Sequence, residues 1–150
     1  MDAEESYDEY WKIGQNGFGE WDKQSFRRLL SPSNGLESVL DYGWSYAGAY
    51  RRRLSDAVKT YVGADVAQTA LATVRQGGFS TLRNNPGNRA IDCADNRFDG
   101  AACIEVFEHL FDHLQTAGEI NRVLKTGGVP VASVPNFGYF AWRLLALLRA

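Results

Sequence analysis

An aspartate and a glycine of the sequence are spaced in a way that suits nucleoside binding. Asp65 ends a short apolar stretch, and it follows Gly43 at about the 20-residue interval typical of nucleoside-binding strand–helix–strand units. The glycine would let the backbone turn tightly beside a ligand. The carboxylate would accept hydrogen bonds from both ribose hydroxyls. The same position is also compatible with Asp65 acting as a cap of the following helix.

Two neighbouring residues, Glu108 and His109, are candidates for proton transfer. Either side chain could accept a proton from a substrate hydroxyl or ammonium group, although a histidine here more often braces a loop. His113 follows four residues after His109, so the pair would share a face if the segment is helical. No third ligand accompanies them, and Cys93 and Cys103 are not spaced as zinc ligands, so we predict no metal site.

The hydrophobic pattern predicts the elements that would position these residues. Short apolar runs predict five strands, at residues 37–42, 57–64, 79–82, 98–104 and 129–134. Amphipathic stretches predict helices at residues 49–55, 67–76, 111–124 and 140–148. This alternation predicts an α/β fold, a doubly wound sheet with helices on both faces. Ligands of such sheets bind at the carboxyl ends of the strands, near the topological switch point.

Composition excludes several other classes of function. The chain has 150 residues, enough for one domain, and a net charge of −2, which gives no general attraction to nucleic acid. The most apolar stretch, residues 137–148, is too short to span a membrane. Two cysteines and an acidic amino terminus without the pattern of a signal peptide predict a cytoplasmic protein.

Three segments of the second half resemble motifs of the class I S-adenosylmethionine-dependent methyltransferases. Residues 95–110 (DNRFDGAACIEVFEHL) resemble the fourth-strand region of these enzymes. Residues 119–128 (EINRVLKTGG) resemble a helix end of the family, and residues 133–138 (SVPNFG) resemble the end of its fifth strand. Residues 7–11 (YDEYW) resemble its lead-in helix. The type-11 and methionine-biosynthesis protein W-like groups are the most similar subfamilies.

This resemblance implies a Rossmann-like sheet of five mainly parallel strands in the order 3-2-1-4-5, without the usual sixth and seventh strands. It implies S-adenosyl-L-methionine as cofactor, and methyl transfer to an O, N or C atom of a small-molecule acceptor. Asp41 would orient the first loop, Asp65 would bind the ribose, and Ile104 would offer backbone contacts. The implied cofactor-binding residues are Asp41, Gly43, Ser45, Gly48, Asp65, Val66, Ile104 and Glu105, and the implied catalytic residues are Glu108 and His109.

The first loop departs from the family pattern. Residues 41–48 read DYGWSYAG where family members usually have D-x-G-C-G-x-G, so Trp44 and Ser45 replace a Cys-Gly pair. The departure motivates an alternative function, a methyltransferase-like binding or regulatory module without turnover. After the third predicted strand, Asn84 and Asn85 are the nearest polar candidates for contact with the adenine.

We expect one domain over residues 1–150, with three parts. Residues 1–30 would form a helical cover, residues 37–136 the cofactor-binding core, and residues 138–150 a carboxy-terminal helix. The sequence ends about where sixth and seventh strands would follow, so we expect a fragment or a five-stranded variant. The fifth strand would then be an exposed sheet edge, covered by the carboxy-terminal helix or by a second copy in a homodimer.

Overall fold

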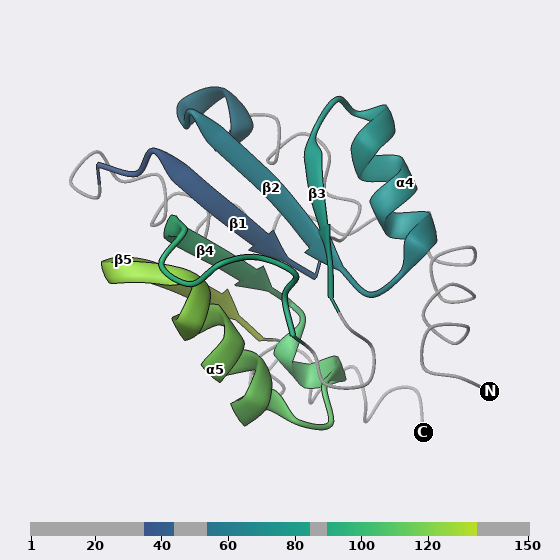
Figure 1. Ribbon diagram of the computed structural model, residues 1–150. Coiled ribbons are helices and arrows are strands. Elements are labelled where there is room, and N and C mark those ends of the chain that lie inside the picture. The colour runs from purple at the N-terminus through teal and green to yellow at the C-terminus, as the bar shows by residue number, and fades with distance from the viewer. Residues whose placement is uncertain (1–34, 44–53, 85–89, 135–150) are drawn as a thin grey trace, which may run out of the picture.

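The strands form one parallel sheet. The computed structural model describes residues 35–43, 54–84 and 90–134. Within these ranges, five strands pair in the order β3-β2-β1-β4-β5, and their arrows point the same way in Figure 1. The predicted fold class and strand order are confirmed. The strands are β1 (Ser38–Tyr42), β2 (Thr60–Asp65), β3 (Ser80–Arg83), β4 (Phe98–Ile104) and β5 (Leu124–Ser133).

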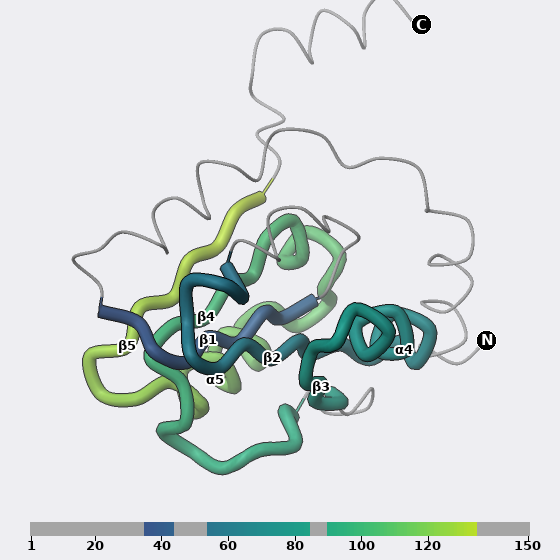
Figure 2. Tube along the Cα trace, turned by 90° about the horizontal axis from the view of Figure 1, so that it is seen from above, coloured from purple at the N-terminus to yellow at the C-terminus, as the bar shows by residue number. Residues whose placement is uncertain are grey.

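The first strand of the chain lies in the middle of the sheet. β1 pairs with β2 on one side and with β4 on the other, so the strand order reverses direction here. Seen from above in Figure 2, β3 and β5 lie on opposite sides of this centre. β1 and β4 are almost wholly buried, which explains their nearly continuous apolar sequences. The carboxyl edge beside β1 is therefore the place where the fold predicts a ligand.

The two long helices differ from the predicted helices only at their ends. α4 spans Gln68–Gln76 and ends at a pair of glycines, as predicted, with Gly78 at a φ of +84°. α5 spans His113–Val123, so the predicted helix over residues 111–124 began too early. The side chain of Asp112 caps α5, because it accepts a hydrogen bond from a backbone N–H of the first turn at 2.9 Å.

α4 and α5 cover opposite faces of the sheet. Ile120 of α5 belongs to a buried cluster that contains Leu40 of β1. Val74 of α4 belongs to a second cluster, which contains the preceding β1 residue, Val39. Successive side chains of a strand point to opposite faces, so the two clusters lie on the two sides of the sheet. The predicted helices on both faces are thus confirmed.

The fifth strand begins five residues earlier than predicted. Residues 125–128, expected to be the turn after the helix, form part of β5. The pairing with β4 shifts register between Phe98 and Gly100, and Gly127 has a φ of +81°. A Cβ atom on Gly128 would lie 2.9 Å from the carbonyl oxygen of Lys125. β5 pairs with β4 at Leu124 and again from Val129 on, so the glycines lie in an irregularity between these pairs rather than at a helix end.

The second strand begins later than predicted. Residues 54–57 are helical, and β2 starts at Thr60 instead of residue 57. Leu54 is fully buried in the cluster on the α4 face, which holds this helical turn against the sheet. The backbone N–H of Thr60 then donates to the carbonyl of Glu37 at 2.9 Å. β4 has the predicted bounds, whereas β1 and β3 each begin one residue later than predicted.

Asp99 connects the amino-terminal ends of three strands. Its Oδ2 accepts hydrogen bonds from the backbone N–H and the hydroxyl of Ser38, at 2.9 and 2.7 Å. Its Oδ1 accepts one from Nζ of Lys125 at 2.7 Å. The bond from Lys125, followed by those from Ser38, lowers the pKa of Asp99 to about 2 although partial burial opposes this. A single carboxylate of β4 thereby fastens β1 and β5 at the edge opposite the candidate site.

Some of the predictions fall on parts of the chain that lie outside the described residues. They are the helical cover at residues 1–30, most of the predicted helix at 49–55, and the predicted carboxy-terminal helix at 138–150. Among the helices of the described ranges, none is long and apolar enough to cross a membrane.

Candidate functional site

The structure brings several predicted site residues to one edge of the sheet. Gly43 follows β1, Asp65 ends β2, and Ile104 ends β4. The three strands are adjacent and parallel, so their carboxyl ends meet. The backbone N–H of Gly43 donates to the carbonyl of Ala64 at 2.8 Å, which continues the pairing of β1 with β2 into the turn.

Gly43 occupies a position that no other residue would fit without strain. Its φ is +74°, a conformation that L side chains rarely adopt. A Cβ atom on Gly43 would lie 2.4 Å from Cγ2 of Val106, which follows β4. The glycine therefore serves both the turn after β1 and the close approach of the segment after β4. Ser45 and Gly48, predicted in the same loop, lie outside the described residues.

Asp41 lies inside the sheet and is fully buried. Its Oδ2 accepts a hydrogen bond from the hydroxyl of Tyr61 at 2.5 Å. A buried carboxylate requires such partners, because it has lost its hydration. Sequence reasoning missed Tyr61. The signal that could have found it is register: Asp41 pairs with Gly63, and Tyr61 lies two residues earlier in β2, on the same face.

Asp65 is almost fully buried at the end of β2. Its Oδ1 accepts a hydrogen bond from the backbone N–H of Ala67 at 2.8 Å, which fixes the turn into α4. The alternative prediction, that Asp65 caps the next helix, is wrong: the N-cap of α4 is Ala67, and the helix has no side-chain cap. A carboxylate oxygen has two lone pairs, so this bond does not exclude a second donor such as a ribose hydroxyl. Val66, the next residue, is also buried.

Asn84 lies beside Asp65, directly after β3. It is 1% exposed, and its backbone N–H donates to the carbonyl of Asp65 at 2.9 Å. Its side-chain Oδ1 is buried and accepts no hydrogen bond from the described residues. An unpartnered buried amide oxygen is costly in a folded protein, so this atom is suited to accept a donor that a ligand brings. Asn85, the other polar candidate, lies outside the described residues.

Glu105 follows Ile104 with an unusual backbone. Its φ is +55°, in the left-handed region that residues with a Cβ rarely occupy. Two hydrogen bonds to Ser133 hold it there: its N–H donates to the Ser133 carbonyl at 3.0 Å, and its Oε1 accepts from the Ser133 hydroxyl at 2.6 Å. The sequence pattern gave no role to Ser133 itself, because the contact depends on the register in which β5 pairs with β4.

The two predicted catalytic residues lie in the short 3₁₀ helix η2 (Phe107–His109), just after β4. Burial raises the pKa of Glu108, and the charge of Glu105 adds to this effect. The side chain of His109 is exposed, and its Nε2 lies 3.8 Å from Oε1 of Glu108. Glu108 is thus the more enclosed of the two candidate bases.

The two histidines do not form the shared helical face that their spacing suggested. His109 belongs to η2, whereas His113 begins α5, where its Nδ1 lies 3.2 Å from the carbonyl oxygen of Leu110. Within residues 35–43, 54–84 and 90–134, no group of three or more potential ligands is arranged to hold a metal ion.

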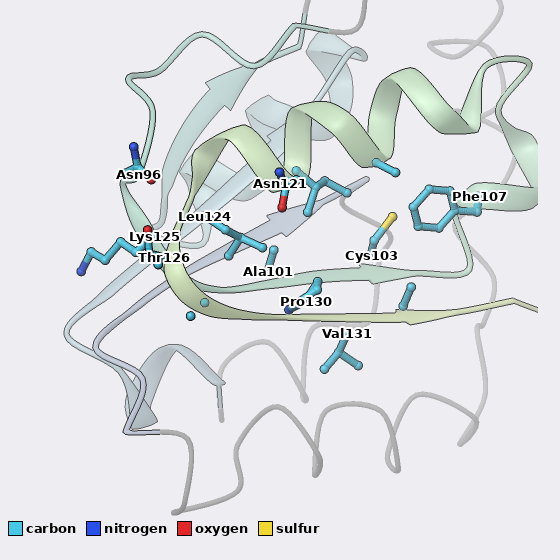
Figure 3. Close-up of a pocket in the computed structure, with 15 residues that line it drawn as sticks. Asn96, Ala101, Cys103, Phe107, Asn121, Leu124, Lys125, Thr126, Pro130 and Val131 are labelled. Atoms are coloured by element: carbon cyan, nitrogen blue, oxygen red, sulfur yellow. The ribbon is translucent and has the colours of Figure 1, made fainter.

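A groove of about 450 Å³ lies elsewhere, between α5 and β5. Figure 3 shows Phe107 and Cys103 toward one end of it and Lys125 and Thr126 toward the other. None of the predicted cofactor-binding or catalytic residues in the described ranges lines this groove. Cys103 is a buried core thiol, as predicted, and burial raises its pKa. The groove is therefore separate from the residues gathered beside β1 and β2.

Comparison with known proteins identifies the family. A family model described as a methyltransferase domain matches residues 40–132. A Mycolicibacterium smegmatis protein named "Probable S-adenosylmethionine-dependent methyltransferase" is 32% identical over 84 residues. The match covers 55% of this chain and 32% of that protein, so the chain spans about a third of the length of this relative.

Solved structures agree at the level of the fold. An S-adenosylmethionine-dependent methyltransferase from Mesorhizobium loti superposes with a TM-score of 0.65 at 21% identity, over 82% of this chain and 57% of that one. A methyltransferase of the same kind from Thermotoga maritima gives 0.64 at 17% identity, over 95% and 63%. Because the family model covers more than half of the chain and the sheet has the same doubly wound architecture, the chain belongs to the class I S-adenosylmethionine-dependent methyltransferase family.

Proposed function

We propose that this protein binds S-adenosyl-L-methionine at the carboxyl edge beside β1 and β2, and that it transfers the methyl group to an O, N or C atom of a small molecule. One observation carries the proposal. The turn at Gly43 and the buried carboxylate of Asp65 meet at the topological switch point, where this fold binds ligands.

The donors and acceptors at this edge suit the parts of the cofactor. Asp65 offers carboxylate oxygens to the ribose hydroxyls, and Val66 offers an apolar side chain next to it. The buried amide oxygen of Asn84 suits an exocyclic amine such as that of adenine, since it accepts no hydrogen bond from the described residues. Asp41, held by Tyr61, would orient the loop that contains Ser45 and Gly48.

The chemistry asked of the protein is mainly positioning. When bound, the cofactor supplies a methyl group on a sulfonium, which is already a strong electrophile. The chain's own residues would hold the acceptor in line with that methyl group and keep water out. Glu108 would take the proton of a hydroxyl or ammonium acceptor, because its raised pKa makes it a better base than an ordinary carboxylate. His109, 3.8 Å away, is the second candidate.

We also propose that other segments cover the cofactor and the free edge of the sheet. Residues 1–30 would cover the cofactor, and residues 138–150 or a second copy of the chain would cover the free edge of β5. We expect the protein to act in the cytoplasm and without nucleic acid.

The alternative function, a binding or regulatory module without turnover, is favoured by the replacement of the usual Cys-Gly pair with Trp44 and Ser45.

Two measurements test the function and separate the alternatives. Calorimetric titration with S-adenosylmethionine and S-adenosylhomocysteine should show binding of both, and no binding at millimolar concentration would contradict either version of the proposal. Incubation of the protein with a cell extract and methyl-labelled cofactor should then give a labelled small-molecule product. Binding without any labelled product would favour the module without turnover.

A further inference from the structure

Glu105 lies in a backbone conformation that its own residue type does not favour. A φ of +55° brings its side chain close to its own backbone, at a cost that surrounding contacts must offset. The residue directly follows buried Ile104, at the edge where we place the cofactor. Whatever holds Glu105 therefore also sets the path of the chain along this edge.

Ser133 holds Glu105 by both its backbone and its side chain. It is the last residue of β5 and pairs in register with Ile104, so its carbonyl is in place to accept from the Glu105 N–H at 3.0 Å. Its hydroxyl donates to Oε1 of Glu105 at 2.6 Å, a short bond of the kind that a charged acceptor forms. The hydroxyl is half-buried, so water competes less for this contact than at an exposed site.

The held segment connects to the rest of the site. Val106, the next residue, packs so closely on Gly43 that a Cβ there would meet it at 2.4 Å. The carbonyl of Val106 accepts a hydrogen bond from the N–H of His109 at 2.9 Å, which closes η2 with Glu108 inside it. A shift of Glu105 would thus move the turn after β1 and the candidate bases together.

We propose that Ser133 is a positioning residue of the cofactor site, which acts through its hydroxyl on Glu105 and contacts neither cofactor nor acceptor itself. This inference rests on the proposed function and adds a residue to which the sequence pattern assigned no role. If so, the Ser133 hydroxyl affects cofactor binding only while the Glu105 carboxylate is present.

The test compares two substitutions of Ser133 whose new side chains have nearly the same shape. Ser133→Val removes the hydroxyl, whereas Ser133→Thr keeps it, and both β-branched side chains suit a strand. With S-adenosylhomocysteine as the probe in calorimetry, we expect Ser133→Val to raise Kd about tenfold, the size of a lost hydrogen bond to a charged group. Ser133→Thr should stay within about threefold of the wild type. Thr126→Val, the same loss of a hydroxyl at an exposed position of β5, should leave Kd unchanged.

A double-substitution cycle decides whether Ser133 acts through Glu105. In a Glu105→Ala background, Ser133→Val should raise Kd no further, because the partner of the hydroxyl is already gone. An equal effect of Ser133→Val in both backgrounds would overturn the inference, as would a Ser133→Val variant that binds like the wild type. If the thermal midpoint shows that Ser133→Val does not fold, Ser133→Ala takes its place with the same expectations. A wild-type chain that fails to bind the probe would overturn the proposed function, and this inference with it.

Discussion

At the scale of single residues, the site depends on a few positions where backbone shape and chemistry coincide. Gly43 is the clearest case, because it combines a φ of +74° with a contact to Val106 that leaves no room for a Cβ atom. The turn after β1 and the segment after β4 are both parts of the candidate site. Packing therefore constrains a residue that we also propose for the cofactor site.

We predict that Gly43→Ala lowers the free energy of unfolding by about 2–4 kcal/mol, from the unfavourable φ and from overpacking against Val106. Urea unfolding measures the effect. Gly35→Ala is the matched control, since Gly35 also has a positive φ, +56°, but has nothing within 4 Å of an added Cβ. It should cost only about 1 kcal/mol. An equal loss of stability in the two variants would show that the contact with Val106 does not destabilise Gly43→Ala.

Only some of these residues could be predicted from the sequence. Gly43 and Asp65 were identified by their spacing and their places at strand ends, and the structure puts both at the predicted edge. Tyr61 and Ser133 were not, because their importance lies in a partner on another strand. The residue type determines which hydrogen bonds a side chain can form. The register of the strands determines which partner that side chain meets.

At the scale of elements, apolar runs in the sequence predicted the strands that are buried on both faces of the sheet. β4, which lies between β1 and β5 and is almost wholly buried, has the predicted bounds. The boundary between α5 and β5 could not be predicted in this way. The pattern of residues 125–128 predicts a turn that ends a helix, yet these residues form an irregularity inside β5, between its pairs with β4 at Leu124 and Val129. Pairing on both sides of the glycines therefore placed a predicted turn inside a strand.

At the amino-terminal ends of β1, β4 and β5, the hydrogen bonds of Asp99 should make the stability of the fold depend on pH. The bonds from Lys125 and Ser38 lower the pKa of Asp99 from 3.8 to about 2. Because the folded-state pKa lies below the unfolded one, this group stabilises the fold at a pH above about 4, and the contribution is lost as the pH falls toward 2. Its size is about 1–2 kcal/mol, since Lys125 is partly exposed to solvent.

We expect Asp99→Asn to be less stable than the wild type at pH 7 and equally stable near pH 2, as measured by urea unfolding across this range. Lys125→Met should weaken the same pH dependence, because it removes the largest cause of the shift. Asp56→Asn, at an exposed position, serves as the control and should follow the wild type throughout. A constant difference between Asp99→Asn and the wild type at every pH would refute the assigned role.

At the scale of the whole molecule, family membership rests on a match over residues 40–132, and the sheet order agrees with it. The acceptor could not be predicted, because methyl transfer from a sulfonium needs positioning more than a fixed set of catalytic residues. The chain spans about a third of the length of its Mycolicibacterium smegmatis relative.

We propose that the carboxyl edge beside β1 and β2 binds the cofactor, with Asp65 on the ribose. The most direct test is calorimetric titration of S-adenosylhomocysteine into the wild type, Asp65→Ala and Asp56→Ala. Loss of charged hydrogen bonds to the ribose should raise Kd by about 10- to 100-fold in Asp65→Ala, while the exposed Asp56→Ala binds like the wild type. Undiminished binding by a folded Asp65→Ala variant would contradict the account.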